Sequence, residues 1–239
     1  MNVYEKNDIK DLLGNNPYPG RGIVIGKSED GGKCVFAYFI MGRSENSRNR
    51  VFVEKDGAIV TEPYDYSKVS DPSLIIYSAI RSIGNKIIVT NGDQTDTIYD
   101  RIRVGGDMRL ALRTREFEPD APNLTPRISG VITLNDGNFD YEMSILKSAD
   151  AEGTACNRFF YEYKSIAGVG HFIHTYVTDG NPIPTFQGEP ERVNIPNCID
   201  EFTNGIWESL NENNKISLYV RYIDLESGEA TSRLINKNK

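Results

Sequence analysis

Three arginines in one short segment are the residues whose type and spacing point most directly to chemistry. Arg43, Arg48 and Arg50 lie within eight residues of a 239-residue chain whose formal net charge is −7. Guanidinium groups bind phosphate through paired hydrogen bonds, so arginines that converge suit a phosphomonoester ligand. A run of charges is also typical of a solvated loop, and the spacing alone leaves both interpretations open.

A second polar segment follows a predicted buried strand at 86–90. Residues 91–97 read NGDQTDT, and polar loops at the ends of buried strands often carry ligand sites. The structural alternative is a turn in which Thr95 or Asp96 caps a helix predicted at 97–104. The candidate binding residues of this segment are Asn91, Asp93, Thr95 and Asp96.

A helix is predicted just before that strand. Asp71 is a good N-cap, Pro72 suits a first helical turn, and Gly84 supplies the stop. Apolar residues at 76, 79, 80 and 83 recur at helical spacing and predict the buried stripe. On this helix Tyr77 lies beside the stripe and shares a face with Arg81, four residues later. Most such tyrosines are packing residues with a hydrated hydroxyl.

Turn residues between apolar runs predict consecutive β-hairpins. The predicted hairpins pair 22–25 with 34–41, 51–54 with 58–61, 127–134 with 138–146, and 215–224 with 230–235. Further strands are predicted at 158–164 and 168–177, and further helices at 107–117 and 199–210. Hairpins with two groups of helices predict an α+β fold, with two sheets face to face and helices outside. Without a linker or repeat, residues 1–239 are expected to form a single domain.

Composition and known motifs exclude several classes of function. The acidic net charge argues against nucleic acid binding. Neither a membrane-length apolar stretch nor a signal core in MNVYEKNDIKDLLGNN is present, which predicts a cytoplasmic protein. Three widely spaced cysteines, Cys34, Cys156 and Cys198, predict reduced, buried thiols. His171 and His174 would point to opposite faces of a strand, so joint metal binding is not expected. P-loop, dinucleotide-binding and HExxH motifs are absent.

Five motifs, in order along roughly residues 21–190, resemble the archaeal-type IMP cyclohydrolase family. The last of them is similar to the longer bacterial members of that family. The motifs are GRGIVIG at 20–26, the arginine loop from Arg43 to Asn49-Arg50, the segment from Asp71-Pro72 through Tyr77 to NGDQTD at 91–96, TPRI at 125–128, and the segment from GVGH at 168–171 to Phe186.

The resemblance implies an N-terminal-nucleophile-hydrolase-like fold, which is a four-layer αββα sandwich. It also implies cofactor-free and metal-free cyclisation of 5-formamidoimidazole-4-carboxamide ribonucleotide to IMP, with loss of water. The expected partner is therefore a small purine nucleotide, and a homo-oligomer is compatible with the sequence. The catalytic residues that the resemblance implies are Tyr77, Arg43 and Asn123. The substrate-binding residues that it implies are Arg21, Arg48, Arg50, Asn91, Asp93, Thr95, Asp96, Thr125 and Arg127.

Two departures from the family pattern keep alternatives open. The archaeal loop typically reads Arg-Ser-aromatic-Pro-Asn-Arg, whereas the segment Arg43 to Arg50 is longer and has no aromatic-Pro pair. That change is compatible with a relative that binds purine nucleotides without turnover. Twenty residues precede Arg21, so an N-terminal nucleophile would need cleavage of this leader. The third hypothesis is therefore an amidohydrolase activated by processing.

Overall fold

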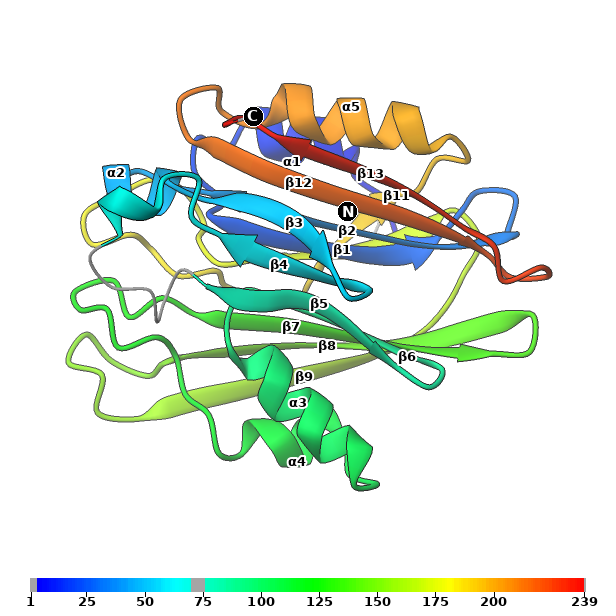
Figure 1. Cartoon of the computed structure of the whole chain (residues 1–239), viewed down its shortest axis with the longest axis horizontal. Helices are drawn as coiled ribbons and strands as arrows, with labels where there is room; N and C mark the ends of the chain where they lie inside the picture. The colour runs from blue at the N-terminus through cyan, green and yellow to red at the C-terminus, as the bar shows by residue number, and fades with distance from the viewer. Residues whose placement is uncertain (1–3, 70–75, 239) are drawn as a thin grey trace.

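Two antiparallel sheets packed face to face form the framework of the chain, and the computed structural model describes residues 4–69 and 76–238 (Figure 1). The six-stranded sheet runs in the order β11 (Glu191–Asn194), β10 (Val169–His174), β1 (Arg21–Lys27), β2 (Lys33–Met41), β12 (Lys215–Asp224), β13 (Ala230–Asn236). The seven-stranded sheet runs in the order β3 (Val51–Lys55), β4 (Ala58–Glu62), β5 (Tyr77–Ile83), β6 (Lys86–Thr90), β7 (Arg127–Asn135), β8 (Asn138–Ser148), β9 (Cys156–Lys164).

The four predicted hairpins are confirmed. They are β1–β2, β3–β4, β7–β8 and β12–β13, and each is an antiparallel pair. Local turn chemistry explains why they could be read from the sequence. In the β3–β4 turn, Asp56 and Gly57 have φ values of 52° and 75°, a conformation that Asp and Gly adopt more readily than other residues.

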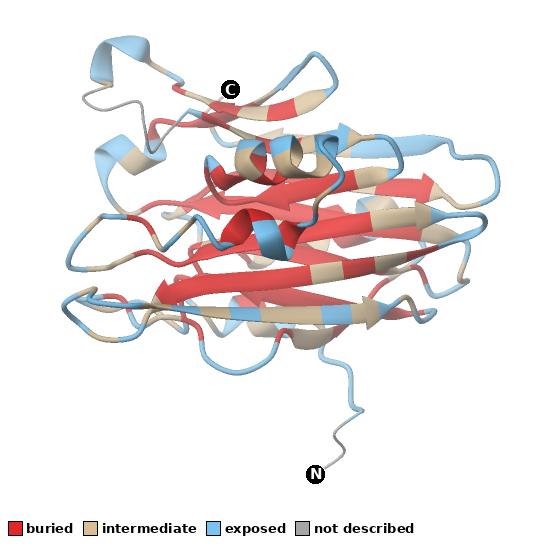
Figure 2. Cartoon of the chain, turned by 90° about the horizontal axis from the view of Figure 1, so that it is seen from below, coloured by how far each residue is buried: buried red, intermediate tan, exposed pale blue. Residues whose placement is uncertain are grey.

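Helices cover parts of the outer faces of both sheets. They are α1 (Ile9–Gly14), α2 (Glu45–Arg48), α3 (Gln94–Arg103), α4 (Met108–Leu112) and α5 (Ile199–Ser209), with a 3₁₀ turn η1 at Tyr66–Lys68. One buried cluster lies between the sheets, a second lies under α1 and α5, and a third lies under α3 and α4. Figure 2 shows these buried residues concentrated along the strands. The chain is therefore an α+β sandwich with helices outside, as predicted.

Strand alternation divides the apolar residues between these clusters. On β2, Phe36, Tyr38 and Ile40 face the other sheet, whereas Ala37 and Phe39 face the helices. Each face of the strand is covered, so β2 reads as a continuous apolar run.

The helix predicted at 71–83 is wrong over its described part, because Tyr77–Ile83 is the strand β5. The pairing of β5 with β4 contains a register shift, so the neighbouring residues Ala79 and Ile80 both contribute to the cluster between the sheets. The resulting spacing of the apolar residues resembles that of a helix. The predicted caps Asp71 and Pro72 lie outside the described residues. The shared face predicted for Tyr77 and Arg81 is also wrong: Tyr77 points into that cluster, whereas Arg81 lies over the ring of Tyr99 on α3.

Two further helix predictions need new boundaries. The helix α3 begins at Gln94 rather than at 97, so part of the predicted polar loop is its first turn. The helix α4 ends at Leu112, and the chain from there to β7 makes turns instead of the continued helix to 117. Helix ends are the least determined part of a sequence pattern because capping contacts and packing decide them.

The two histidines and three cysteines test the predictions on metal and redox chemistry. His171 lies 2.6 Å from the Tyr141 hydroxyl between the sheets, whereas His174 stacks on Phe172 of the outer cluster, so the two point to opposite faces as predicted. All three cysteines are free, but the prediction that they are buried holds only for Cys34, because Cys156 is partly buried and Cys198 is exposed.

His171 is expected to make the fold sensitive to mild acid. Burial, with a smaller contribution from Arg192, lowers the pKa of His171 to about 4 from an ordinary value of 6.5. Because the pKa is lower in the folded state, the neutral ring contributes its stability above pH 6.5, and this contribution is lost as pH falls towards 4. Its size is about 3 kcal/mol. Urea unfolding at pH 7, 5.5 and 4 should therefore show a smaller acid-induced loss for His171→Gln than for the wild type, and equal losses would contradict this reading.

Candidate functional site

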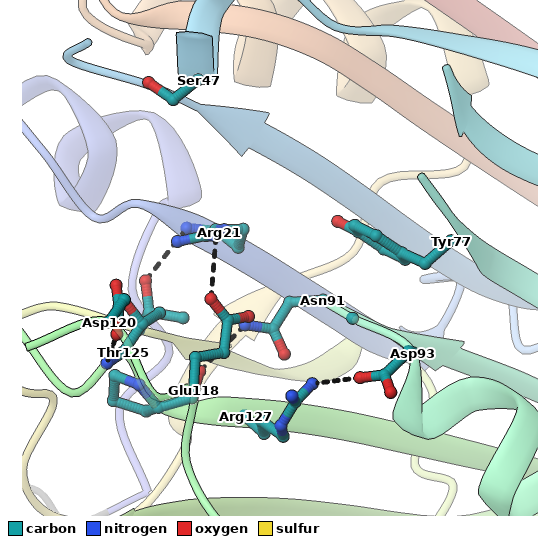
Figure 3. A network of polar contacts seen from close by, with 12 residues as sticks. Arg21, Ser47, Tyr77, Asn91, Asp93, Glu118, Asp120, Thr125 and Arg127 are labelled. Carbon is teal, nitrogen blue, oxygen red and sulfur yellow. Dashed lines mark hydrogen bonds and ion pairs between the residues drawn. The ribbon is translucent and has the colours of Figure 1, made fainter. Parts of the chain in front are cut away.

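The candidate site gathers charged and phenolic side chains at one end of the space between the sheets. Arg21 begins β1, Tyr77 begins β5, and Arg50 directly precedes β3. Glu118 comes from the connection between α4 and β7. Figure 3 shows Arg21, Glu118 and Tyr77 pointing toward a common region from these separate segments. Strand ends suit such a site because side chains there leave the core while the strands hold their backbone in place.

Arg21 and Glu118 form the ion pair of the site. The Nη2 atom of Arg21 lies 3.5 Å from Oε2 of Glu118, and the side chains of Arg21 and Glu118 are 11% and 5% exposed, so Glu118 is buried and Arg21 is largely enclosed. Burial raises the pKa of Glu118, while the charges of Arg21 and Arg127 act in the opposite direction. The Nε atom of Arg21 is buried without a hydrogen-bond partner in the described part of the chain. A buried, unpaired donor beside a carboxyl group with a raised pKa is typical of a functional site.

Arg50 is the second arginine of the site, and its side chain is buried. It is 2% exposed, and its guanidinium donates to main-chain oxygens, from Nε to Ser47 at 2.7 Å and from Nη2 to Met41 at 3.4 Å. Burial lowers the pKa of Arg50, and the nearby charge of Arg21 lowers it further. Among residues 4–69 and 76–238, no carboxylate forms an ion pair with it.

A pair of tyrosine hydroxyls connects the two sheets at this site. Tyr77 on β5 and Tyr38 on β2 are both buried, and their hydroxyl oxygens lie 2.9 Å apart. Tyr77 is close enough to Arg21 and Arg50 to interact with both charges. The sequence identified Tyr77 as a candidate but not Tyr38.

A third tyrosine, Tyr176, is held by a hydrogen-bonded chain that ends at a carboxylate. The Tyr176 hydroxyl lies 2.6 Å from Oγ1 of Thr125, which donates to Oδ2 of Asp120 at 2.5 Å. Tyr176 also stacks on Tyr18 at a centroid distance of 5.8 Å, and both rings are near Arg21. The predicted residue Thr125 therefore lies in the site through its contact with Tyr176.

The predicted polar segment at 91–96 mainly joins the start of α3 to the start of β7. Asn91 accepts from the backbone N–H of Ile128 at 2.8 Å and donates to the Pro126 carbonyl at 2.9 Å. Thr95 shares its hydroxyl with Thr90 at 2.6 Å. These side chains are buried and use their hydrogen-bonding capacity within the protein, so their role in this structure is structural. The predicted capping by Thr95 or Asp96 is wrong, because α3 begins at Gln94 and its N-cap residue is Asp93, whose side chain makes no capping hydrogen bond.

The acidic residues of that segment pair with arginines. Asp93 forms ion pairs with Arg127, at 2.7 Å, and with Arg115. Asp96 pairs with Arg81 at 2.6 Å on the α3 side of the sheet. Arg127 thus borders the site through Glu118 and is itself neutralised by Asp93.

The three arginines at 43–50 do not converge. Nη1 of Arg43 reaches Asp179 at 2.5 Å and the Gly180 carbonyl at 2.7 Å. Arg48 donates to the Gly42 carbonyl and to Asn214. Arg50 lies close enough to Arg21 for the two charges to interact, whereas Arg43 and Arg48 link separate segments of the chain.

Asn123 also links two segments of the chain. Its Oδ1 accepts from the backbone N–H of Ile183 at 3.3 Å, which links the segment before β7 to the connection between β10 and β11. Arg43 holds the same connection from the other side through Asp179. Arg43 also lies over the Tyr18 ring, 5.3 Å from its centroid, and so reaches the rim of the site.

Several residues of the site were missed by sequence reasoning. Local spacing contains no signal for them, because their partners lie far along the chain or on the other sheet. The missed residues are Tyr18, Tyr38, Glu118, Asp120 and Tyr176. Tyr176 stood within a motif that carried the resemblance, which was the one available indication. The described residues contain no group of three His, Cys, Asp or Glu side chains that could hold a metal ion, and no helix there is both long and apolar enough to cross a membrane.

Comparison with known proteins identifies the family. A family model described as "IMP cyclohydrolase-like protein" matches residues 18–228. The chain is 33% identical over 128 residues to an IMP cyclohydrolase of Methanococcus aeolicus, covering 52% of this chain and 62% of that protein. It is 38% identical over 120 residues to one of Methanosphaera stadtmanae, covering 48% and 57%, and 35% identical over 116 residues to one of Methanopyrus kandleri, covering 47% and 57%.

The match therefore spans about 62% of the length of the first of these relatives, whereas the family model spans most of the present chain. Arg21, Arg50, Tyr77 and Glu118, which the fold brings together, all lie within the matched residues. The chain belongs to the IMP cyclohydrolase-like protein family.

Proposed function

We propose that this protein cyclises 5-formamidoimidazole-4-carboxamide ribonucleotide to IMP with loss of water. Family membership and the names of the curated relatives support the reaction. The observation that carries the proposal to this chain is the pair of neighbouring arginines, Arg21 and Arg50, of which only Arg21 forms an ion pair with a carboxylate, Glu118, among the described residues.

The charge of this pair favours an anionic ligand. An arginine buried without a carboxylate is costly unless another anion neutralises it. Arg50 has main-chain partners only, so a bound phosphate or a developing oxyanion would supply the missing charge. A ribonucleotide monophosphate provides both kinds of anion. We assign Arg50 and Arg21 to binding and electrostatic stabilisation, with Arg127 and Thr125 beside them.

The reaction needs positioning more than it needs a strong nucleophile. The carboxamide nitrogen attacks the formyl carbon of the same molecule, a C–N bond forms, and the nitrogen loses a proton. The formyl oxygen takes up this proton and a second one from the formamido N–H, the C–O bond breaks as the ring C=N bond forms, and the oxygen leaves as water. The formamide must first take the reactive rotamer about a partial double bond, whose barrier is about 18 kcal/mol. A pocket that selects the near-attack geometry and stabilises the oxyanion supplies much of the rate.

We assign the proton transfers to Tyr77 and Glu118. The Tyr77 hydroxyl lies beside two guanidinium groups, which suits a group that gives or takes a proton. The Glu118 carboxyl has a pKa raised by burial, so it can hold a proton closer to neutral pH than an exposed glutamate. Arg43 and Asn123 then act on the reaction by holding the connection between β10 and β11.

The architecture supports a finer proposal about fold. Two face-to-face sheets with helices on the outer faces suit the N-terminal-nucleophile-hydrolase-like arrangement that the resemblance implies. We propose that residues 1–239 form one domain of this kind and that Asn91, Asp93, Thr95 and Asp96 serve it by fixing the strand ends around the site.

Purified protein treated with a chelator is expected to convert the formamido ribonucleotide to IMP without added metal or nucleotide. The physical reason is that ring closure within one molecule needs orientation and proton transfer, which the site residues can supply. Formation of IMP, followed by chromatography, checks this. Turnover that requires added zinc would contradict the cofactor-free part. Tight IMP binding with no turnover would instead identify a nucleotide-binding relative.

A further inference from the structure

The hydrogen bond between Tyr38 and Tyr77 is the buried contact whose role the proposed reaction leaves unassigned. Tyr38 is 0% exposed, its ring stacks on Phe52 at a centroid distance of 5.5 Å, and its hydroxyl oxygen lies 2.9 Å from that of Tyr77. The two tyrosines come from different sheets, β2 and β5. The Tyr38 side chain therefore cannot move without disturbing the packing between the sheets.

The direction of this hydrogen bond follows from the surroundings of Tyr38. Within the described ranges, Tyr77 is the only hydrogen-bond partner of the Tyr38 hydroxyl. A buried O–H with no acceptor is much more costly than an oxygen with a spare lone pair. Geometry alone allows either hydroxyl to donate. Tyr38 is 0% exposed and has nowhere else to direct its hydrogen, whereas Tyr77 is 6% exposed and borders the site, so the arrangement that encloses no O–H without an acceptor has Tyr38 as the donor and the Tyr77 oxygen as the acceptor.

The hydrogen of Tyr77 must then point elsewhere. Arg21 and Arg50 lie close enough to Tyr77 for their charges to interact with it, and guanidinium groups have donors but no acceptor. Among the described residues, Tyr38 is the only hydrogen-bond partner of the Tyr77 hydroxyl, and it already donates to it. The Tyr77 hydrogen is consequently available to a ligand, and the ligand must accept it.

We propose that Tyr38 is a positioning residue that donates to the Tyr77 hydroxyl and so directs the Tyr77 hydrogen to the substrate. This rests on the proposed function, in which Tyr77 acts on the substrate. When Tyr77 gives up its proton, the Tyr38 O–H also stabilises the phenolate that forms. Tyr38 touches no substrate in this arrangement, so its effect passes entirely through Tyr77.

Tyr38→Phe keeps the ring stacked on Phe52 and removes only the hydroxyl. We expect kcat to fall about tenfold while KM stays within about twofold, because one hydrogen bond to the phenolate is lost and the arginines are untouched. In a Tyr77→Phe background the same change should leave kcat within about twofold, because Tyr38 then has nothing to position. A tenfold loss in both backgrounds would overturn the proposal, as would no loss in either.

A second measurement does not depend on turnover. The protein is labelled with ¹³C at the tyrosine ring carbon that bears oxygen and observed by NMR. The Tyr77 signal is identified as the one missing from the spectrum of Tyr77→Phe. This signal should move in Tyr38→Phe and stay unchanged in Tyr219→Phe. Tyr219 lies directly beside Tyr38 on β12 and is buried in the same cluster, and among the described residues its hydroxyl makes no hydrogen bond.

The two arms separate the possible failures. If the wild type shows no turnover but the Tyr77 signal still moves in Tyr38→Phe, the proposed function is wrong and the hydrogen bond is supported. If the wild type is active but the Tyr77 signal is unchanged in Tyr38→Phe, only the positioning role of Tyr38 is wrong. Unfolding midpoints of all variants, compared with that of Tyr219→Phe, show whether any loss of kcat is a folding defect.

Discussion

Replacing Tyr77 by phenylalanine is expected to lower kcat by about 10²–10⁴-fold. The change keeps the ring that packs between the sheets and removes the hydroxyl that faces Arg21 and Arg50. If that hydroxyl transfers a proton or donates a hydrogen bond in the transition state, the loss falls on the chemical step. Binding of the nucleotide should change little, because the arginines remain in place. Steady-state rates with the formamido ribonucleotide, together with IMP affinity by calorimetry, measure the two effects.

A different result is expected if Tyr77 is only a packing residue. If the ring only fills the core, Tyr77→Phe should leave kcat within about threefold and the free energy of unfolding within about 0.5 kcal/mol. Because the Tyr38 hydroxyl also loses its partner in this variant, urea unfolding must be measured in parallel. A well-folded variant with near-normal kcat would remove Tyr77 from the mechanism and leave Glu118 and Tyr176 as the candidates for proton transfer.

Replacing Arg50 by methionine is expected to weaken nucleotide binding by about 10²-fold, or about 3 kcal/mol. The estimate assumes two charge-assisted hydrogen bonds from the guanidinium to a phosphate or oxyanion. Arg50 has no carboxylate partner among the described residues, so removing its charge leaves no buried anion behind. The free energy of unfolding should therefore fall by less than about 2 kcal/mol. Calorimetric titration with IMP and with inorganic phosphate measures the affinity.

A matched arginine on the surface controls for the loss of a positive charge. Arg103 on α3 is exposed and pairs with Asp100, so Arg103→Met should leave the affinity for IMP within about twofold. Arg50→Lys keeps a charge but loses the planar fork, and we expect it to recover part of the binding. Equal affinity in Arg50→Met and the wild type would assign the anion to other residues and would contradict the binding role of Arg50.

The strands that the sequence predicted correctly are those set by local chemistry. Each confirmed hairpin has turn residues between two apolar runs, and such turns act within a few residues of the chain. The failed helix at 71–83 shows the limit of the same method. The described part of that segment pairs with β4 and β6, and these partners lie outside any local window. Pairing with existing strands outweighs a helical spacing that includes β-branched isoleucines.

The candidate site divides in a similar way. Motifs named Arg21, Arg50, Tyr77, Thr125 and Arg127, all of which lie in or beside the site. They also named Arg48, which instead contacts Gly42 and Asn214. The motif match could identify residues but not directions, because the direction of a side chain depends on the strand register and on neighbours from other elements.

By itself, the sequence determined the hairpins, the two-sheet α+β class and, through its ordered motifs, the family to which the chain belongs. The partners of the site residues were decided only by tertiary structure. Arg21 meets Glu118 across 97 positions of the chain, and Tyr38 meets Tyr77 across 39. The physical reason is that turns and strand propensities act between near neighbours. Buried charge and hydrogen-bond pairing are instead settled between segments that only the packing of two sheets brings together.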